Sequence, residues 1–176
     1  AHDLAGGGHR QFLDEFNLPL NHIKPHGSLY GVSAKEEDVA NGIADAAEIY
    51  NVGIFGMVNT FHEKVYKERG VKFIAEFYSD LEYDETGYLV IAKGRNKYYP
   101  ADLAVERCLR AIKENKVKTI NGKDMDVGCE TICVHSDTPN AIEILKELRK
   151  NLSKSPTKQS INTNINDNKL PYIVSE

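Results

Sequence analysis

The sequence predicts an α/β protein built from parallel β/α repeats. Apolar runs of strand length occur near residues 22, 53, 73 and 131, and segments with helical periodicity separate them. Continuous apolar strands between helices are typical of a parallel sheet covered on both faces, because right-handed crossovers place the helices there. Four strands are half of the eight that close a β/α barrel, so this chain alone cannot close one.

The first repeats occupy the N-terminal half of the chain. A short helix is expected over 9–17, where aromatic residues have helical spacing, and the first strand follows it. The next helix is predicted over 35–50, because its apolar residues share one face. The apolar run 53–58 has the length of a buried strand, and the helix predicted over 61–70 ends at a glycine.

The regular alternation of strand and helix changes after the third strand, 72–78. A turn is expected at 85–87, and a strong helical pattern follows over 101–115. The segment 117–127 is predicted to form a hairpin with a two-residue turn at Asn121-Gly122, the dipeptide that such turns favour.

The last repeat consists of a strand over 131–135 and a helix over 140–152. The polar stretch that follows has no periodicity. We therefore expect one domain over 1–152 and a disordered tail over 153–176.

Composition limits the possible functions. The 22 Lys and Arg residues against 26 Asp and Glu residues give a formal charge of −4, so no basic field favours nucleic acid. No apolar run approaches the roughly 18 residues that a membrane span needs, and we expect a cytoplasmic protein. Cys108, Cys129 and Cys133 are odd in number and are expected to be buried free thiols.

Ionisable side chains lie in or beyond three of the four strands: Lys24, His26, Glu76, Asp80, His135 and Asp137. The carboxyl ends of parallel strands meet at one edge, which is where α/β proteins hold their sites. His26 and His135 could each act as a general acid or base. Together with a carboxylate they could instead bind a divalent metal ion. Glu76 lies in an apolar strand and must be paired, solvated in a cavity or protonated.

Two other groups of polar residues carry weaker signals. The glycines at 6–8 precede a helix, and His9 and Arg10 beside them could reach an anionic ligand, although a plain turn is the favoured explanation. His22 and His62 are expected at the surface.

Three blocks of the sequence resemble the lactam-utilisation (LamB/YcsF) family: KPHGSLY (24–30), AEFYSDLEYDETGYLV (75–90) and ETICVHSDTP (130–139). DLAGGGHR (3–10) is also similar to a family block, and the resemblance extends to about Arg149. It implies a β/α-barrel-like fold of the glycoside hydrolase and polysaccharide deacetylase type, with a link to carbohydrate metabolism. The family's two opening blocks have no counterpart, so we expect a chain truncated at its N-terminal side. Leu81 and Ser136 also depart from the family pattern.

The resemblance implies ATP-dependent opening of the 5-oxoproline lactam to glutamate, with this chain as one subunit of a complex. No ATP-binding motif is visible, so ATP is expected to bind with the partner subunits. The expected catalytic residues are His26, Glu76, Asp80 and His135. The expected substrate contacts are Lys24, Arg10 and Asp137.

Two alternatives remain open from the sequence. The chain could be a metal-dependent carbohydrate deacetylase or hydrolase of related fold, or a non-catalytic, degenerate subunit. As a truncated barrel, residues 1–176 alone are expected to be poorly stable or to associate, because the sheet edge beside the missing strands is unpaired and recruits other chains. They are also expected to lack lactam-opening activity.

Overall fold

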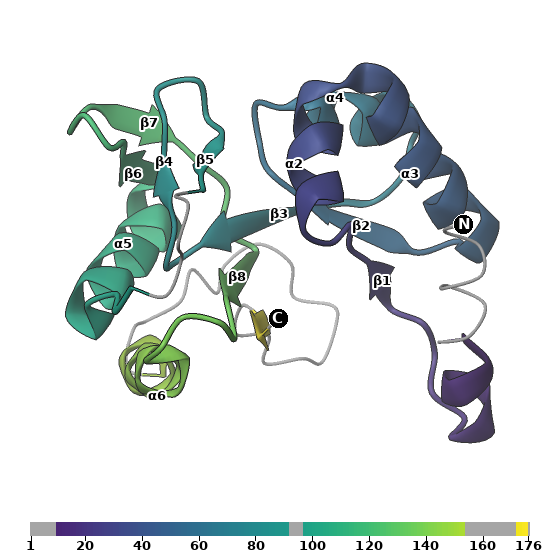
Figure 1. Cartoon of the computed structure of the whole chain (residues 1–176). Coiled ribbons are helices and arrows are strands. Elements are labelled where there is room, and N and C mark those ends of the chain that lie inside the picture. The colour runs from purple at the N-terminus through teal and green to yellow at the C-terminus, as the bar shows by residue number, and fades with distance from the viewer. Residues whose placement is uncertain (1–9, 92–96, 154–171, 176) are drawn as a thin grey trace. The chain divides into compact units, whose positions relative to one another are not determined.

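The computed structural model describes residues 10–91, 97–153 and 172–175, the last of these by their backbone alone. The chain divides into two compact units, Ala1–Ala75 and Glu76–Glu176 (Figure 1). Strand β3 (Phe73–Tyr78) belongs in part to each. The glycines at 6–8 and His9 lie outside the described residues.

The first unit contains the predicted β/α repeats. Its elements beside the first half of β3 are β1 (His22–Ile23), α2 (Ser28–Lys35), α3 (Glu37–Tyr50), β2 (Gly53–Gly56) and α4 (Phe61–Glu68). Strands β1, β2 and β3 are parallel, with Ile23 opposite Ile54 and Ile54 opposite Phe73. Helices α2, α3 and α4 pack on one another (Figure 1). Their core combines small alanines of α3 with Ile54, Val65 and Tyr66.

Helix α2 was not predicted from the sequence. A single helix was expected over 35–50, but the chain is already helical from Ser28, and the extended residue Glu36 (φ −122°, ψ 114°) separates α2 from α3. Gly27, with φ of 57°, leads the chain into α2. The segment contains a glycine and several residues of modest helix propensity, so its local signal is weak and packing against α3 and α4 stabilises it.

The second unit continues the parallel pairing. In addition to β3 it contains β4 (Glu82–Tyr83), β5 (Leu89–Val90), α5 (Ala101–Glu114), β6 (Lys116–Lys118), β7 (Asp124–Asp126), β8 (Thr131–Val134), α6 (Ala141–Leu152) and β9 (Tyr172–Ser175). Strand β8 is parallel to both β3 and β9. Helices α5 and α6 pack against each other, whereas β4–β5 and β6–β7 form small antiparallel pairs. All four strands predicted from apolar runs are present and parallel.

Two features of the second unit differ from the predictions. The β6–β7 loop is one residue longer than expected, because Thr119 and Lys123 close it through a backbone hydrogen bond of 2.8 Å. Within this loop only Gly122 has a positive φ, 79°, whereas a two-residue type I′ turn requires a positive φ at both central residues.

Strand β9 lies in the segment expected to be disordered. The sequence did not predict β9, because a strand of four residues after a polar stretch is too short to show a clear hydrophobic periodicity. Residues 154–171 lie outside the described residues.

The three cysteines are free, and Cys108 and Cys133 are buried. Within the described ranges, no helix is both long enough and apolar enough to cross a membrane.

His62 is fully buried, which corrects the expectation of a surface position. The Met57 amide donates to its Nδ1 (3.2 Å), so Nε2 carries the hydrogen that faces Ser33 Oγ at 2.8 Å. The Ser33 hydroxyl in turn donates to the Tyr30 carbonyl (3.2 Å). This chain of hydrogen bonds joins α2 and α4 to the residue that follows β2. His22 is half-buried, with its ring stacked 4.0 Å from that of Phe55.

The His62 ring requires a glycine beside it. A Cβ atom at Gly56 would lie 2.7 Å from the His62 Cβ and 3.0 Å from the Phe73 ring. We therefore predict that Gly56→Ala lowers the free energy of unfolding by about 1–3 kcal/mol, the usual cost of overpacking. Gly42→Ala is the matched control, because Gly42 is exposed in α3 and its added Cβ meets nothing within 4 Å. Denaturant unfolding should show a loss in the first variant and a small gain in the second. Equal effects would contradict the packing argument.

The same burial predicts a pH dependence of stability. Burial lowers the pKa of His62 to about 4 from 6.5, and a hydrogen bond with Tyr30 only partly opposes this. Between these values the unfolded chain binds a proton that the folded chain does not, so stability falls as pH decreases from 6.5 towards 4. The expected contribution is about 3 kcal/mol. In His62→Gln, urea unfolding should show a weaker loss over this range. An unchanged pH dependence would show that His62 is not the responsible group.

Candidate active site

Asp80 and His135 meet beyond the carboxyl ends of β3 and β8. Tyr78 in β3 lies opposite Cys133 in β8, so the residues that follow both strands emerge at the same end. Asp80 Oδ1 lies 2.8 Å from His135 Nδ1, and the two residues are 5% and 7% exposed. The structure therefore brings together two of the four predicted catalytic residues in a buried carboxylate–imidazole pair.

The Asp80 carboxylate accepts two further hydrogen bonds. Its Oδ2 accepts from the backbone N–H of His135 (3.0 Å) and from the hydroxyl of Thr138 (2.7 Å). Burial would raise the pKa of the Asp80 carboxyl, but the hydrogen bonds from His135 and Thr138 outweigh it and hold this pKa below its usual range. Asp80 is therefore ionised at neutral pH.

This carboxylate fixes the hydrogen on the His135 ring. An ionised Asp80 only accepts hydrogen bonds, so His135 Nδ1 carries the hydrogen and Nε2 carries the lone pair. The ring stacks on Tyr78, with centroids 5.4 Å apart and planes inclined by 25°. Cys133 Sγ lies 4.0 Å from Nε2. The orientation of His135 is thus set by a carboxylate, a ring and a neighbouring strand residue.

Glu76 lies in the same unit, in β3, and is 2% exposed. The Tyr78 hydroxyl donates to Glu76 Oε2 (3.2 Å), which satisfies the expectation that a carboxylate in this strand must be paired. The two residues are two apart in a strand and so share a face. Because Tyr78 also stacks on His135, it links Glu76 to the Asp80–His135 pair.

Tyr83 holds the backbone at the end of β3. Its hydroxyl oxygen accepts the backbone N–H of Tyr78 (2.9 Å), and its ring stacks on Phe77 at 5.7 Å. Burial raises the pKa of the Tyr83 hydroxyl, so the group stays neutral. The backbone that carries Tyr78 is therefore held by a fixed side chain.

The structure gives the other predicted site residues no contact with this pair among those described above. Asp137 is exposed in the turn between β8 and α6. Arg10, Lys24 and His26 belong to the first unit. There, Lys24 Nζ lies 5.6 Å from the centre of the Tyr30 ring, and His26 is exposed in the turn before α2. Arg10 is exposed and lies 3.9 Å from Asp14.

Sequence reasoning missed the contributions of Thr138 and Tyr78. Thr138 stands in a polar turn before a proline, where a hydroxyl commonly bonds a neighbouring group. Tyr78 was not among the predicted site residues. Tyr78 lies two residues after Glu76 in a strand, and this spacing alone could have predicted that the two side chains share a face.

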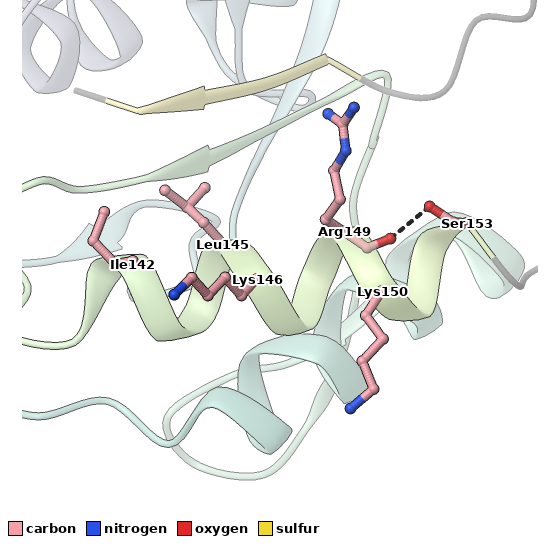
Figure 2. Close-up of a pocket in the computed structure, with 6 residues that line it drawn as sticks. All are labelled: Ile142, Leu145, Lys146, Arg149, Lys150 and Ser153. Atoms are coloured by element: carbon pink, nitrogen blue, oxygen red, sulfur yellow. Dashed lines mark hydrogen bonds between the residues drawn. The ribbon is translucent and has the colours of Figure 1, made fainter.

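A hollow on α6 does not involve these residues. It is lined by Ile142, Leu145, Lys146, Arg149, Lys150 and Ser153 (Figure 2). Ile142 is 65% exposed, so this is an open surface feature. Over the described ranges, no group of three or more His, Cys, Asp or Glu side chains is arranged to hold a metal ion.

Comparison with known proteins identifies clear counterparts. The chain is 36% identical over 146 residues to a 5-oxoprolinase subunit of Alkaliphilus metalliredigens (strain QYMF), covering 81% of this chain and 57% of that protein. It is 37% identical over 152 residues to lactam utilization protein lamB of Emericella nidulans, covering 82% and 58%. The chain thus spans little more than half the length of these relatives.

The structural comparison agrees. The crystal structure of a lactam utilization protein from Thermus thermophilus matches with a TM-score of 0.72 and 27% identity, covering 82% of this chain and 58% of that one. This confirms the predicted α/β class and the partial β/α barrel. The LamB/YcsF family matches residues 7–166, which is most of the sequence. The chain therefore belongs to the LamB/YcsF family.

Proposed function

We propose that the protein containing this chain opens the lactam ring of 5-oxoproline to glutamate, as one subunit of an ATP-dependent enzyme. The names of its relatives, a 5-oxoprolinase subunit and lactam utilization protein lamB, support this reaction class. The observation that carries the proposal is the buried Asp80–His135 pair, with its 2.8 Å contact.

The pair supplies the proton transfer that lactam opening needs. A lactam carbonyl is stabilised by resonance and is a weak electrophile, so water attacks its carbon more readily when a base removes a proton from the water. His135 Nε2 takes that proton, and Asp80 stabilises the imidazolium that forms. As the ring C–N bond breaks, the proton passes to the ring nitrogen, which becomes the amine of glutamate. Asp80 stays ionised throughout.

The remaining predicted residues have supporting roles in this proposal. Glu76, held by Tyr78, orients the attacking water or accepts a proton. For Lys24 and His26, which belong to the first unit, we keep the roles expected from the sequence, an anion partner and an acid or base respectively. Asp137, which lies two residues after His135, is expected to contact the substrate, and for Arg10 of the first unit we keep the role of a contact for an anionic group.

ATP would activate the carbonyl oxygen by transfer of its γ-phosphoryl group with release of ADP. After the ring opens, hydrolysis of the acyl phosphate by a second water would release phosphate and glutamate. The sequence contains no G-x-x-x-x-G-K-[ST] motif, so we assign the nucleotide site to the partner subunits. The bacterial relative is named as one subunit of 5-oxoprolinase, which supports a complex of several chains. A metal-dependent deacetylase is the second candidate from the sequence, but no observation on the described residues favours it.

Substitution of the pair tests the proposal. In the complete protein reconstituted with its partner subunits, His135→Gln and Asp80→Asn should each reduce ATP-dependent glutamate release by about 10²–10⁴-fold. His135→Gln removes the proton acceptor, and Asp80→Asn removes the charge that fixes the ring. Asp126→Asn is the matched control for the second change, because Asp126 is exposed in the β6–β7 hairpin.

The assay is glutamate formation from 5-oxoproline, with circular dichroism of each variant to verify folding. Activity close to wild type in a folded His135→Gln protein would remove the histidine from the mechanism. No glutamate release by the wild-type complex would refute the reaction itself.

A further inference from the structure

A buried arginine lies beside the turn that carries Asp80. Arg107 is in α5 and is 7% exposed. Its Nη2 donates to the Leu81 carbonyl (2.6 Å), and its Nη1 donates to Glu82 (3.2 Å) and to the Tyr99 hydroxyl. Leu81 immediately follows Asp80 in the chain. The guanidinium therefore binds the backbone one residue away from the proposed catalytic carboxylate.

Three aromatic rings surround this guanidinium. Its central carbon lies 5.9 Å from the ring centre of Phe77, 6.0 Å from that of Tyr83 and 5.8 Å from that of Tyr99. Tyr99 also donates its hydroxyl hydrogen to Glu82 (2.9 Å). Arg107 is thus held in one position by hydrogen bonds and by aromatic rings, with little freedom to move.

Stability alone does not account for a charged side chain at this position. The Nε atom of Arg107 is buried and has no hydrogen-bond partner among the described residues. An unsatisfied buried donor destabilises a fold, and an apolar side chain of similar volume often stabilises such a position at least as well. The benefit of Arg107 must therefore come from what its guanidinium holds.

The Asp80 turn is held from two sides. On one side, the backbone N–H and hydroxyl of Ser79 both donate to the Cys133 carbonyl of β8, at 3.1 and 2.9 Å. On the other side, Arg107 holds the Leu81 carbonyl. Asp80 lies between these two anchors, which restrict the backbone that carries its carboxylate.

We propose that Arg107 is a positioning residue for Asp80: by holding the Leu81 carbonyl, it keeps the carboxylate in contact with His135 and Thr138. The consequence for catalysis rests on the proposed function, whereas the consequence for the geometry of Asp80 does not. Loss of the guanidinium lets the turn relax and lengthens the hydrogen bonds to the carboxylate.

The titration of Asp80 measures this directly. Carbon-13 NMR of the carboxyl group should show that Arg107→Met raises the pKa of Asp80 by about one unit, because weaker hydrogen bonds stabilise the ionised form less. Arg107→Lys keeps a positive charge but cannot bridge the same acceptors, so a smaller rise is expected. Arg110→Met is the matched control on α5, because Arg110 pairs with Asp124 and Glu114 in the hairpin and helix. It should leave the Asp80 titration unchanged.

An unchanged Asp80 titration in folded Arg107→Met, or an equal rise in Arg110→Met, would overturn the proposal. If Arg107→Met does not fold, Arg107→Lys decides, and an Asp80 titration identical to wild type in that variant overturns it.

A kinetic measurement separates this inference from the proposed function. In the reconstituted enzyme, Arg107→Lys should lower kcat by about tenfold or more with little change in KM, because Arg107 affects the geometry of the reacting groups. A wild-type complex without 5-oxoprolinase activity would refute the function, while the NMR titration would still test the role of Arg107.

Discussion

The hydrogen bond between Asp80 and His135 is the constraint on which the rest of this site depends. A carboxylate that is 5% exposed must have its charge compensated, and three donors from the β8 end and the following turn do this. The parallel register of β3 and β8 places Asp80 next to those donors. Fold and site are therefore coupled, because any change in that register would leave a buried charge unpaired.

Two buried histidines, His62 and His135, show how the surroundings of a side chain decide its role. The ring of His62 accepts a backbone N–H at Nδ1 and faces the Ser33 hydroxyl at Nε2, and burial lowers its pKa to about 4, so it stays neutral and serves packing. His135 has an ionised carboxylate at Nδ1 instead. That carboxylate holds the hydrogen on Nδ1 and leaves Nε2 as the proton acceptor that proton transfer requires. Residue type alone does not distinguish these roles.

Apolar runs and the polar residues that follow them are local features of the sequence. They were enough to predict the four strands near residues 22, 53, 73 and 131 and the polar residues at their carboxyl ends. Asp80 and His135 were correctly placed at neighbouring strand ends, although their catalytic roles remain predictions. Helix α2, the burial of His62 and the part played by Arg107 were not predicted. Each of these depends on contacts between segments distant in the chain, such as Arg107 with Leu81, and a single sequence has no local pattern that encodes them.

The tautomer of the His135 ring tests the central claim most directly. Nitrogen-15 NMR of the imidazole at neutral pH distinguishes a hydrogen on Nδ1 from one on Nε2. The Asp80–His135 hydrogen bond predicts the Nδ1–H form in the wild-type protein, with this preference lost in Asp80→Asn. A wild-type ring with its hydrogen on Nε2, or one with the same tautomer preference in Asp80→Asn, would contradict the claim.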